Sequence, residues 1–214
     1  TPAQYTATMT QVSCPGGNDG TATANIIPAA PGATYTWSNG QTTQTATGLT
    51  AGTYTCNVAT PSGCSGSVTI TVTEIPGMIL NLTNVVNANC NSINNGSANM
   101  NVTQGTPGYL YSWTGSASVS NMAIDLGAGP HTVTVTDANG CVRDTTFNIS
   151  EPPALAISFL TQDTMICPEA SITLSAQGIG GSSPYIFSWV DNNGNSFGPA
   201  SSITVDPATT PTQY

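Results

Sequence analysis

The 214-residue sequence contains no lysine, one arginine (Arg143) and one histidine (His131). Ten acidic residues against one arginine give a formal net charge of −9, and charged residues make up only 5% of the chain. A surface with almost no cations cannot neutralise phosphates, so we expect no nucleic-acid partner. The chain is nevertheless not expected to be disordered, because 38% of its residues are hydrophobic.

Long apolar runs and helical periodicity are also missing. No run reaches about 18 apolar residues, so we expect no membrane span. No segment resembles a signal peptide, so we expect a mature chain or a fragment. What the sequence does contain is period-two alternation, as where Val68, Ile70 and Val72 alternate with Ser and Thr. This pattern predicts strands with one buried face. Asn-Gly pairs at 39–40, 95–96, 139–140 and 193–194 predict positive-φ turns.

One sequence unit occurs three times. "NDGTATANI" (residues 18–26) matches "NNGSANMNV" (residues 94–102). A cysteine opens each unit and a tryptophan follows it by 22 or 23 residues; these are Cys14, Cys90 and Cys167, and Trp37, Trp113 and Trp189. The sequence therefore predicts an all-β, tandem array of three small immunoglobulin-like β-sandwich domains, the third incomplete.

The predicted divisions are an N-terminal strand at 1–11, repeats at 12–76 and 77–153, and a third domain at 154–214. The joints contain proline, at Pro76 and at Pro152 and Pro153. Proline stiffens a short linker, so we expect an extended array with limited bending.

Six cysteines without a C-x-x-C pair favour disulfides over metal and an oxidising, extracellular location. Equivalent placement in the first two repeats predicts the bonds Cys14–Cys64 and Cys90–Cys141, with the repeated tryptophan packed near each bridge. Cys56 aligns with Val133, which predicts a buried thiol. The expected partner of Cys167 would lie near residue 217, so an intermolecular bridge is the alternative for that residue.

Catalytic residues are hard to find. His131 aligns with Tyr54 and is expected to fill a structural strand position. The aspartates are scattered over turns and strand ends, where Asp usually caps or bends the backbone. Asp137 near Asn139 supplies a fragment of a calcium site, and calcium is the one cofactor that the residues suggest. We therefore expect no catalytic residues and a protein that is not an enzyme.

Three stretches resemble one family: "CPGGNDGTATA" (residues 14–24), "YTWSNGQTTQTATGLTAGTY" (residues 35–54) and "TDANGC" (residues 136–141). They resemble the SprB repeat, which builds long surface adhesins of gliding bacteria exported by type IX secretion. The third unit, with "ICPEASITLSAQG" (residues 166–178) and "ITVDPATTPTQY" (residues 203–214), resembles a PKD-type or related immunoglobulin-like domain.

The resemblance implies a non-enzymatic, extracellular role at the bacterial cell surface, in adhesion, in a filament or stalk, or in gliding motility. The alternative is an adhesin module that binds carbohydrate or a surface, with surface polysaccharide as partner. Tyr109 and Tyr185, beside proline-containing turns, are the aromatic residues that would favour it. Thr145 and Thr164 lie in Asp-Thr triplets that resemble O-glycan acceptors of such bacteria, and both are expected to be exposed.

The two ends of the chain look alike, "TPAQY" and "TPTQY". The third unit lacks a last strand, and the N-terminal segment Tyr5, Thr6, Ala7, Thr8, Met9 and Thr10 has the missing pattern. One hypothesis is that the end of one copy is completed by the beginning of the next copy, either by covalent tandem repetition in a giant chain or by a strand donated between subunits. Copies of the chain would then assemble head to tail. Two alternatives stay open. The segment is the first strand of its own unit, or the third unit is open only because the sequence stops there.

Overall fold

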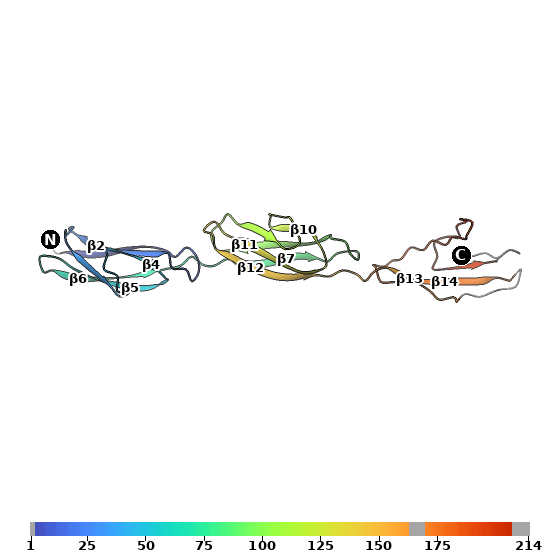
Figure 1. Cartoon of the computed structure of the whole chain (residues 1–214), viewed down its shortest axis with the longest axis horizontal. Helices are drawn as coiled ribbons and strands as arrows, with labels where there is room; N and C mark the ends of the chain where they lie inside the picture. Colours follow the sequence, from blue (N-terminus) through green and yellow to red (C-terminus); the bar gives the residue numbers. More distant parts are fainter. Residues whose placement is uncertain (1–2, 163–169, 207–214) are drawn as a thin grey trace. The chain divides into compact units, whose positions relative to one another are not determined.

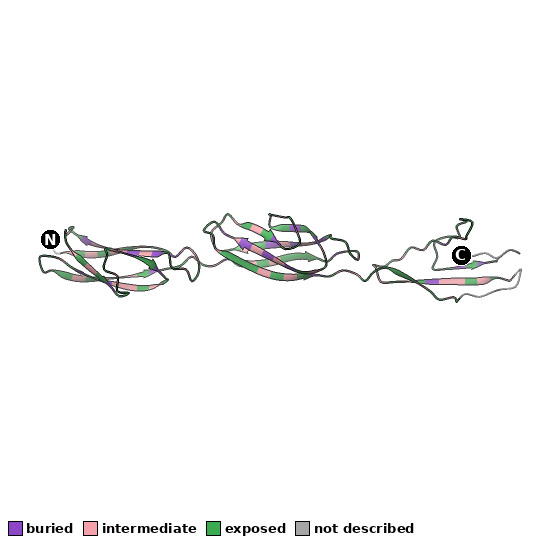
Figure 2. Ribbon diagram, in the orientation of Figure 1, coloured by how far each residue is buried: buried purple, intermediate pink, exposed green. Residues whose placement is uncertain are grey.

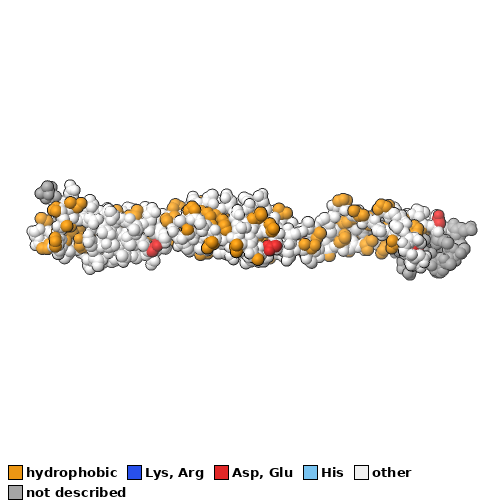
Figure 3. Space-filling view, turned by 90° about the horizontal axis from the view of Figure 1, so that it is seen from above, with side chains coloured by type: hydrophobic (Ala, Val, Ile, Leu, Met, Phe, Trp, Pro, Cys, Tyr) orange, Lys and Arg blue, Asp and Glu red, His pale blue; other side chains and the backbone are white. Residues whose placement is uncertain are grey.

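A computed structural model describes residues 3–162 and 170–206. Their regular secondary structure consists of β-strands alone (Figure 1). They form five three-stranded sheets. No helix in this part of the chain is long and apolar enough to cross a membrane. The all-β prediction is confirmed. Figure 3 shows acidic side chains as isolated points on the face in view, as expected when only 5% of residues are charged.

Two sheets make up the first unit, here called sandwich one. One sheet has the order β1-β2-β4 and the other the order β3-β5-β6. The strands are β1 (Gln4–Thr10), β2 (Gly20–Ile27), β3 (Thr34–Trp37), β4 (Thr45–Leu49), β5 (Gly52–Ala59) and β6 (Ser65–Val72). Both sheets contribute to one buried cluster that includes Ala24, Trp37, Leu49 and Val58. The predicted alternation along β6 is confirmed, because its apolar residues turn inward and its threonines outward (Figure 2).

Sandwich two repeats this order, with β10-β8-β7 in one sheet and β12-β11-β9 in the other. Its strands are β7 (Ile79–Val86), β8 (Gly96–Thr103), β9 (Leu110–Trp113), β10 (Met122–Leu126), β11 (Gly129–Thr136) and β12 (Val142–Ile149). Val133 of β11 lies opposite Trp113, as Cys56 of β5 lies opposite Trp37. The alignment of Cys56 with Val133 is therefore confirmed.

Sheet three consists of β13 (Ala156–Phe159), β14 (Ile172–Ile179) and β15 (Ser202–Val205), paired in that order. It corresponds to the β1-β2-β4 sheet, since Phe159 pairs with Ala176 as Ala7 pairs with Ala24. Residues 170–206 contain no further strands that would form a second sheet. The prediction of an incomplete third sandwich holds for the described residues.

By its internal contacts the chain divides into two compact units. One comprises Thr1–Thr83, Asn99–Met122 and Thr132–Thr146, and the other comprises Asn84–Ala98, Ala123–His131 and Phe147–Tyr214. The first joint, between sandwiches one and two, thus lies inside one unit. The second joint, before sheet three, lies inside the other. The boundaries at residues 76 and 153 stay a prediction.

Three of the four predicted Asn-Gly turns are present in the structure. Gly40, Gly140 and Gly194 have φ of +88°, +84° and +84°, so these predicted turns are confirmed. The turn predicted at 95–96 is wrong. Gly96 begins β8, and a Cβ there would lie 2.7 Å from Ile149 Cγ2 and 2.9 Å from the Leu126 carbonyl. Glycine is needed at this position for close packing rather than for its φ.

The N-terminal strand belongs to its own sandwich. β1 pairs with β2 along its whole length, from Gln4 opposite Ile27 to Thr10 opposite Thr21. Tyr5 and Met9 pack against the core. The hypothesis that residues 5–10 complete a neighbouring copy is therefore wrong, because their backbone and inward side chains are already used within the first unit. The alternative of a first strand of unit one is confirmed.

Candidate functional site

The predicted disulfide pairings are wrong. The structure joins Cys14 to Cys141, 127 residues apart, with their Cα atoms separated by 5.5 Å. Cys64 and Cys90 are free and exposed. The bond therefore links sandwich one to sandwich two instead of closing a loop within either.

The physical reason lies in the direction of the strands. Val12, just after β1, forms a parallel bridge with Glu74, just after β6, so both strands end at the same end of sandwich one. Cys64 precedes β6 and lies at the opposite end. Eight residues of strand span roughly 26 Å, whereas a disulfide needs Cα atoms within about 7 Å. Cys14 and Cys64 cannot meet, although the repeats place them at matching positions.

The turn that presents Cys141 is held by one carboxylate. Oδ1 of Asp137 accepts the backbone N–H groups of Asn139 and Cys141, both at 2.9 Å, and Oδ2 accepts that of Thr106 at 3.0 Å. Asp137 is only 4% exposed. Burial by itself raises the pKa of this carboxyl, but the backbone N–H groups outweigh that effect and hold the pKa below its ordinary value. The carboxylate stays charged and fixes the turn.

Further contacts close the first joint. The Asn139 amide donates to the Ser13 carbonyl at 3.4 Å and to the Thr106 hydroxyl at 2.9 Å. Glu74 accepts the N–H of Gly16 at 2.8 Å. A Cβ on Gly77 would lie 2.9 Å from the ring of Pro15. The loop after β1, the linker and the Asp137–Cys141 turn are thus in direct contact around the disulfide.

The second joint repeats much of this arrangement. Glu151 accepts the N–H of Ser92 at 2.6 Å and the side-chain amide of Asn91 at 2.9 Å. The Asn89 carbonyl, equivalent to that of Ser13, accepts the hydroxyl of Ser182 at 3.2 Å. Cys90 stands where Cys14 stands in the first joint but keeps a free, exposed thiol.

Cys56 is buried, as predicted, and burial raises the pKa of its thiol. Cys167 and its predicted intermolecular bridge lie outside the described residues. Each repeated tryptophan is in a core, and each indole donates to a loop carbonyl within 2.9 Å, at Thr43, Ser120 and Ala200. The core position is confirmed. The expected packing of the tryptophan against a bridge is wrong, because the disulfide joins loops outside the core.

His131 has a structural role, as expected. Its Nε2 lies 2.8 Å from the Gly127 carbonyl and its ring lies 5.6 Å from that of Phe147. Tyr54, the aligned residue, donates its hydroxyl to the matching carbonyl of Thr50 at 3.0 Å. Both side chains therefore fasten the same loop to the strand that follows it.

The candidate ligand-binding aromatics are less available than the sequence indicated. Tyr109 and Tyr185 are half-buried. Tyr109 donates to the Gln104 carbonyl at 2.7 Å and Tyr185 to the Gly180 carbonyl at 2.6 Å. Both phenol groups thus fasten the loop before them.

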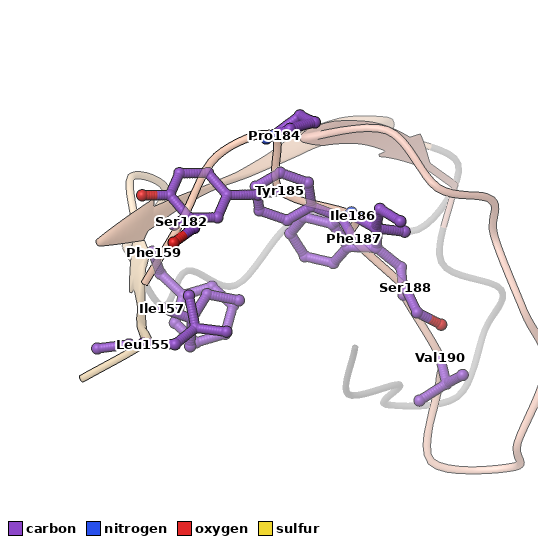
Figure 4. A pocket seen from close by; sticks show the side chains of 13 residues that line it. Leu155, Ile157, Phe159, Ser182, Pro184, Tyr185, Ile186, Phe187, Ser188 and Val190 are labelled. Carbon is purple, nitrogen blue, oxygen red and sulfur yellow. The ribbon is translucent and has the colours of Figure 1, made fainter. Parts of the chain in front are cut away.

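A groove of about 470 Å³ opens on sheet three (Figure 4). β13 contributes Ile157 and Phe159, and the segment after β14 contributes Tyr185, Phe187 and Trp189. Ile157 and Phe159 are 58% and 61% exposed, whereas the matching Tyr5 and Ala7 of β1 are half-buried under β6. The groove is therefore the inner face of sheet three, which residues 170–206 leave uncovered.

The predicted modification and calcium residues have mixed outcomes. Thr145 is half-buried on the side of β12 that also carries Phe147 and Ile149, so its expected exposure is wrong. Thr164 lies outside the described residues. O-glycosylation of either stays a prediction. The oxygens of Asp137 are occupied by N–H groups, and no group of three or more His, Cys, Asp and Glu side chains gathers within the described part of the chain.

Comparison with solved structures shows the fold. The three N-terminal domains of the highly immunogenic outer capsid protein (Hoc) of bacteriophage RB49 align with a TM-score of 0.52 and 15% identity, over 93% of this chain and 80% of that chain. Titin domains I67–I69 give 0.34 and 16%, over 97% and 89%. Sidekick-1 immunoglobulin domains 1–5 give 0.31 and 13%, over 97% and 54%.

No curated protein sequence matches the chain. The family comparison matches two segments, residues 6–42 and 82–118, which are 76 residues apart and fall in the two units that carry the quoted motifs. Each segment runs from the first strand of a sandwich past its tryptophan. The chain therefore contains two SprB repeats, one in each of its first two immunoglobulin-like units.

Proposed function

We propose that this chain is a repeat module of a non-enzymatic bacterial surface protein, and that it builds the stalk or filament of an adhesin. The observation that carries the proposal is the covalent joint, in which Cys14–Cys141 ties one SprB repeat to the next. Disulfides persist in extracellular settings. A bond between domains fixes how successive repeats connect, which a stalk needs and an isolated binding domain does not.

The ionisable side chains support a structural role. The carboxylates of Asp19, Glu74, Asp137, Glu151 and Asp191 each accept backbone N–H groups of nearby turns or joints. Catalysis needs titratable groups that converge on a substrate. These groups are instead distributed along the chain and used one at a time.

Labelling of intact cells that make the native protein tests the proposal. We expect antibodies against the β5–β6 turn (residues 60–64) to label unpermeabilised cells, and brief protease treatment of whole cells to remove the label. Electron microscopy of the shed material should show filaments with an axial repeat of about three domains. Label that appears only after permeabilisation would contradict a surface role.

The groove on sheet three favours a second candidate function, a module that binds carbohydrate or a surface. The half-buried Tyr185 and Phe187 supply aromatic area there, and sugars stack on such rings. Binding of the chain to surface polysaccharide should then fall when Ile186, 91% exposed in the groove, is changed to Asp. Ile124→Asp, at an exposed position of β10, is the matched control. Export by type IX secretion, gliding motility and head-to-tail association of copies belong to the surface-protein proposal above, the last through a contact other than residues 5–10. All three have to be tested in cells that make the native protein.

A further inference from the structure

The position of the disulfide within the chain has a mechanical consequence. Cys14 follows β1 by four residues, and Cys141 immediately precedes β12. Strands β2 to β11 all lie between the two cysteines. Tension applied to the two ends of the chain therefore reaches Cys14 through β1, crosses the bond, and continues through β12.

We propose that β1, the Cys14–Cys141 bond and β12 form a strap that carries tension past the folded bulk of both SprB repeats. The bond holds the two Cα atoms 5.5 Å apart, so the 126 residues between the cysteines cannot be drawn out while it is intact. The strap is useful only to a protein that is pulled, so its biological role rests on the proposed surface function. Its mechanics can be measured on the isolated chain.

The two strands of the strap suit this load. A β-strand already rises about 3.3 Å per residue, close to the limit of about 3.6 Å for a stretched chain. Tension along β1 or β12 therefore lengthens neither strand appreciably. It also pulls neither one away from its neighbours, because the rest of each sandwich lies off the load path and can move with the strand.

Without the bond, the load path changes. Tension would leave sandwich one through residues 73–76. Side chains join this segment to the loop after β1 through the Gln11–Thr73 and Gly16–Glu74 hydrogen bonds. Its backbone is joined to the same loop by the Val12 N–H to Thr73 carbonyl and Ile75 N–H to Val12 carbonyl hydrogen bonds. These two bonds, 2.9 and 3.1 Å long, would be sheared directly. The remaining strands would then unravel in turn.

The first joint is also built to hold the strap in place. The Asp137 carboxylate fixes the turn that carries Cys141, and Asn139 donates to the Ser13 carbonyl beside Cys14. The two sulfur atoms are thus held together by contacts on both sides. Sheet three lies beyond Cys141 and has no such protection, so it is the part of the described chain that yields first.

Pulling single molecules by their two termini tests the strap. The oxidised chain should release contour length only from residues outside 15–140. Adding reductant should release a further length of roughly 440 Å, from 127 residue separations at about 3.5 Å each. Without reductant, Cys14→Ser should release the same contour length as the reduced wild-type chain. Cys64→Ser, at a free thiol, is the matched control and should keep the protection.

Two outcomes would overturn the proposal. One is full extension of the oxidised wild-type chain. The other is protection of only about 50 residues that disappears in Cys64→Ser, which would place the bond inside sandwich one. Comparing the wild-type chain with and without reductant removes the concern that Cys14→Ser folds poorly. Loss of surface labelling on cells would refute the proposed function but not this mechanical result.

Discussion

Cys56, Cys64 and Cys90 are free thiols in two different settings. Cys56 is fully buried opposite Trp37, whereas the other two are exposed at turns or joints. Burial blocks access to the Cys56 sulfur and raises its pKa, which lowers the thiolate fraction. We expect a maleimide to add to Cys64 and Cys90 in the native protein and to Cys56 only after unfolding. Intact mass with and without guanidinium measures this, and rapid native labelling of all three would contradict it.

Asp137 is the single side chain on which the shape of the Cys141 turn depends. Asp137→Ala leaves three backbone N–H groups without their acceptor. Asn139 is exposed, but Thr106 and Cys141 are half-buried, and a buried donor without an acceptor costs about 1–3 kcal/mol. We expect the free energy of unfolding to fall by at least about that amount at pH 7. Asp144→Ala, at an exposed position of β12, is the control and should have little effect. Urea unfolding of the three proteins measures the difference.

The same carboxylate predicts a pH dependence. Its pKa is lower in the folded state, so its contribution to stability is present above the ordinary Asp value of about 3.9 and is lost as pH falls through the folded pKa. The stability gap between wild type and Asp137→Ala should therefore shrink as the pH drops below about 4. A gap that stays constant down to pH 2 would show that the charge of Asp137 is not what holds the turn.

At the scale of the strand, β2 and β8 each need a glycine as their first residue. A Cβ on Gly20 would lie 2.8 Å from Val72 Cγ1 and 2.9 Å from the Leu49 carbonyl, and Gly96 is equally crowded. Gly20→Ala and Gly96→Ala should each destabilise their own sandwich by about 1–3 kcal/mol through overpacking. Gly52→Ala, where the nearest atom is 3.8 Å away, should be tolerated. Thermal unfolding of the wild type and the three variants measures these losses of stability. Equal melting temperatures would refute the overpacking at Gly20 and Gly96.

The strands themselves were largely predictable from sequence, and the disulfide was not. Alternation along β6, β8, β11 and β14 marks one buried face, and the structure buries that face. Alignment of the repeats also placed Cys56 and His131 correctly. It could not pair Cys14, because alignment shows which positions are equivalent and not which ones are near in space. The partner of Cys14 is equivalent to Cys64 but belongs to the next repeat.

The groove on sheet three was missed for a related reason. The alternating residues of β13 and β14 predict a buried face, and nothing local to Ile157 or Phe159 indicates that residues 170–206 provide no second sheet to cover it. Exposure of such a face depends on strands elsewhere in the chain. Sequence reasoning at the level of the element therefore predicts the face but not its partner.

For the whole molecule, the disulfide should stabilise both SprB repeats and leave sheet three unaffected. Closing a loop of 127 residues in the unfolded chain is worth about 5 kcal/mol by the chain-entropy estimate. Cys14→Ser should lower the urea midpoint of the transition reported by Trp37 and Trp113. Trp189, which reports on sheet three, should show an unchanged midpoint.

Chains with a single tryptophan, made by changing the other two to Phe, separate the signals. Cys64→Ser serves as the control, because its thiol is free. If Cys64→Ser lowers the Trp37 midpoint as much as Cys14→Ser does, the bond lies within sandwich one. If only Cys14→Ser and Cys141→Ser lower it, the bond joins one SprB repeat to the next.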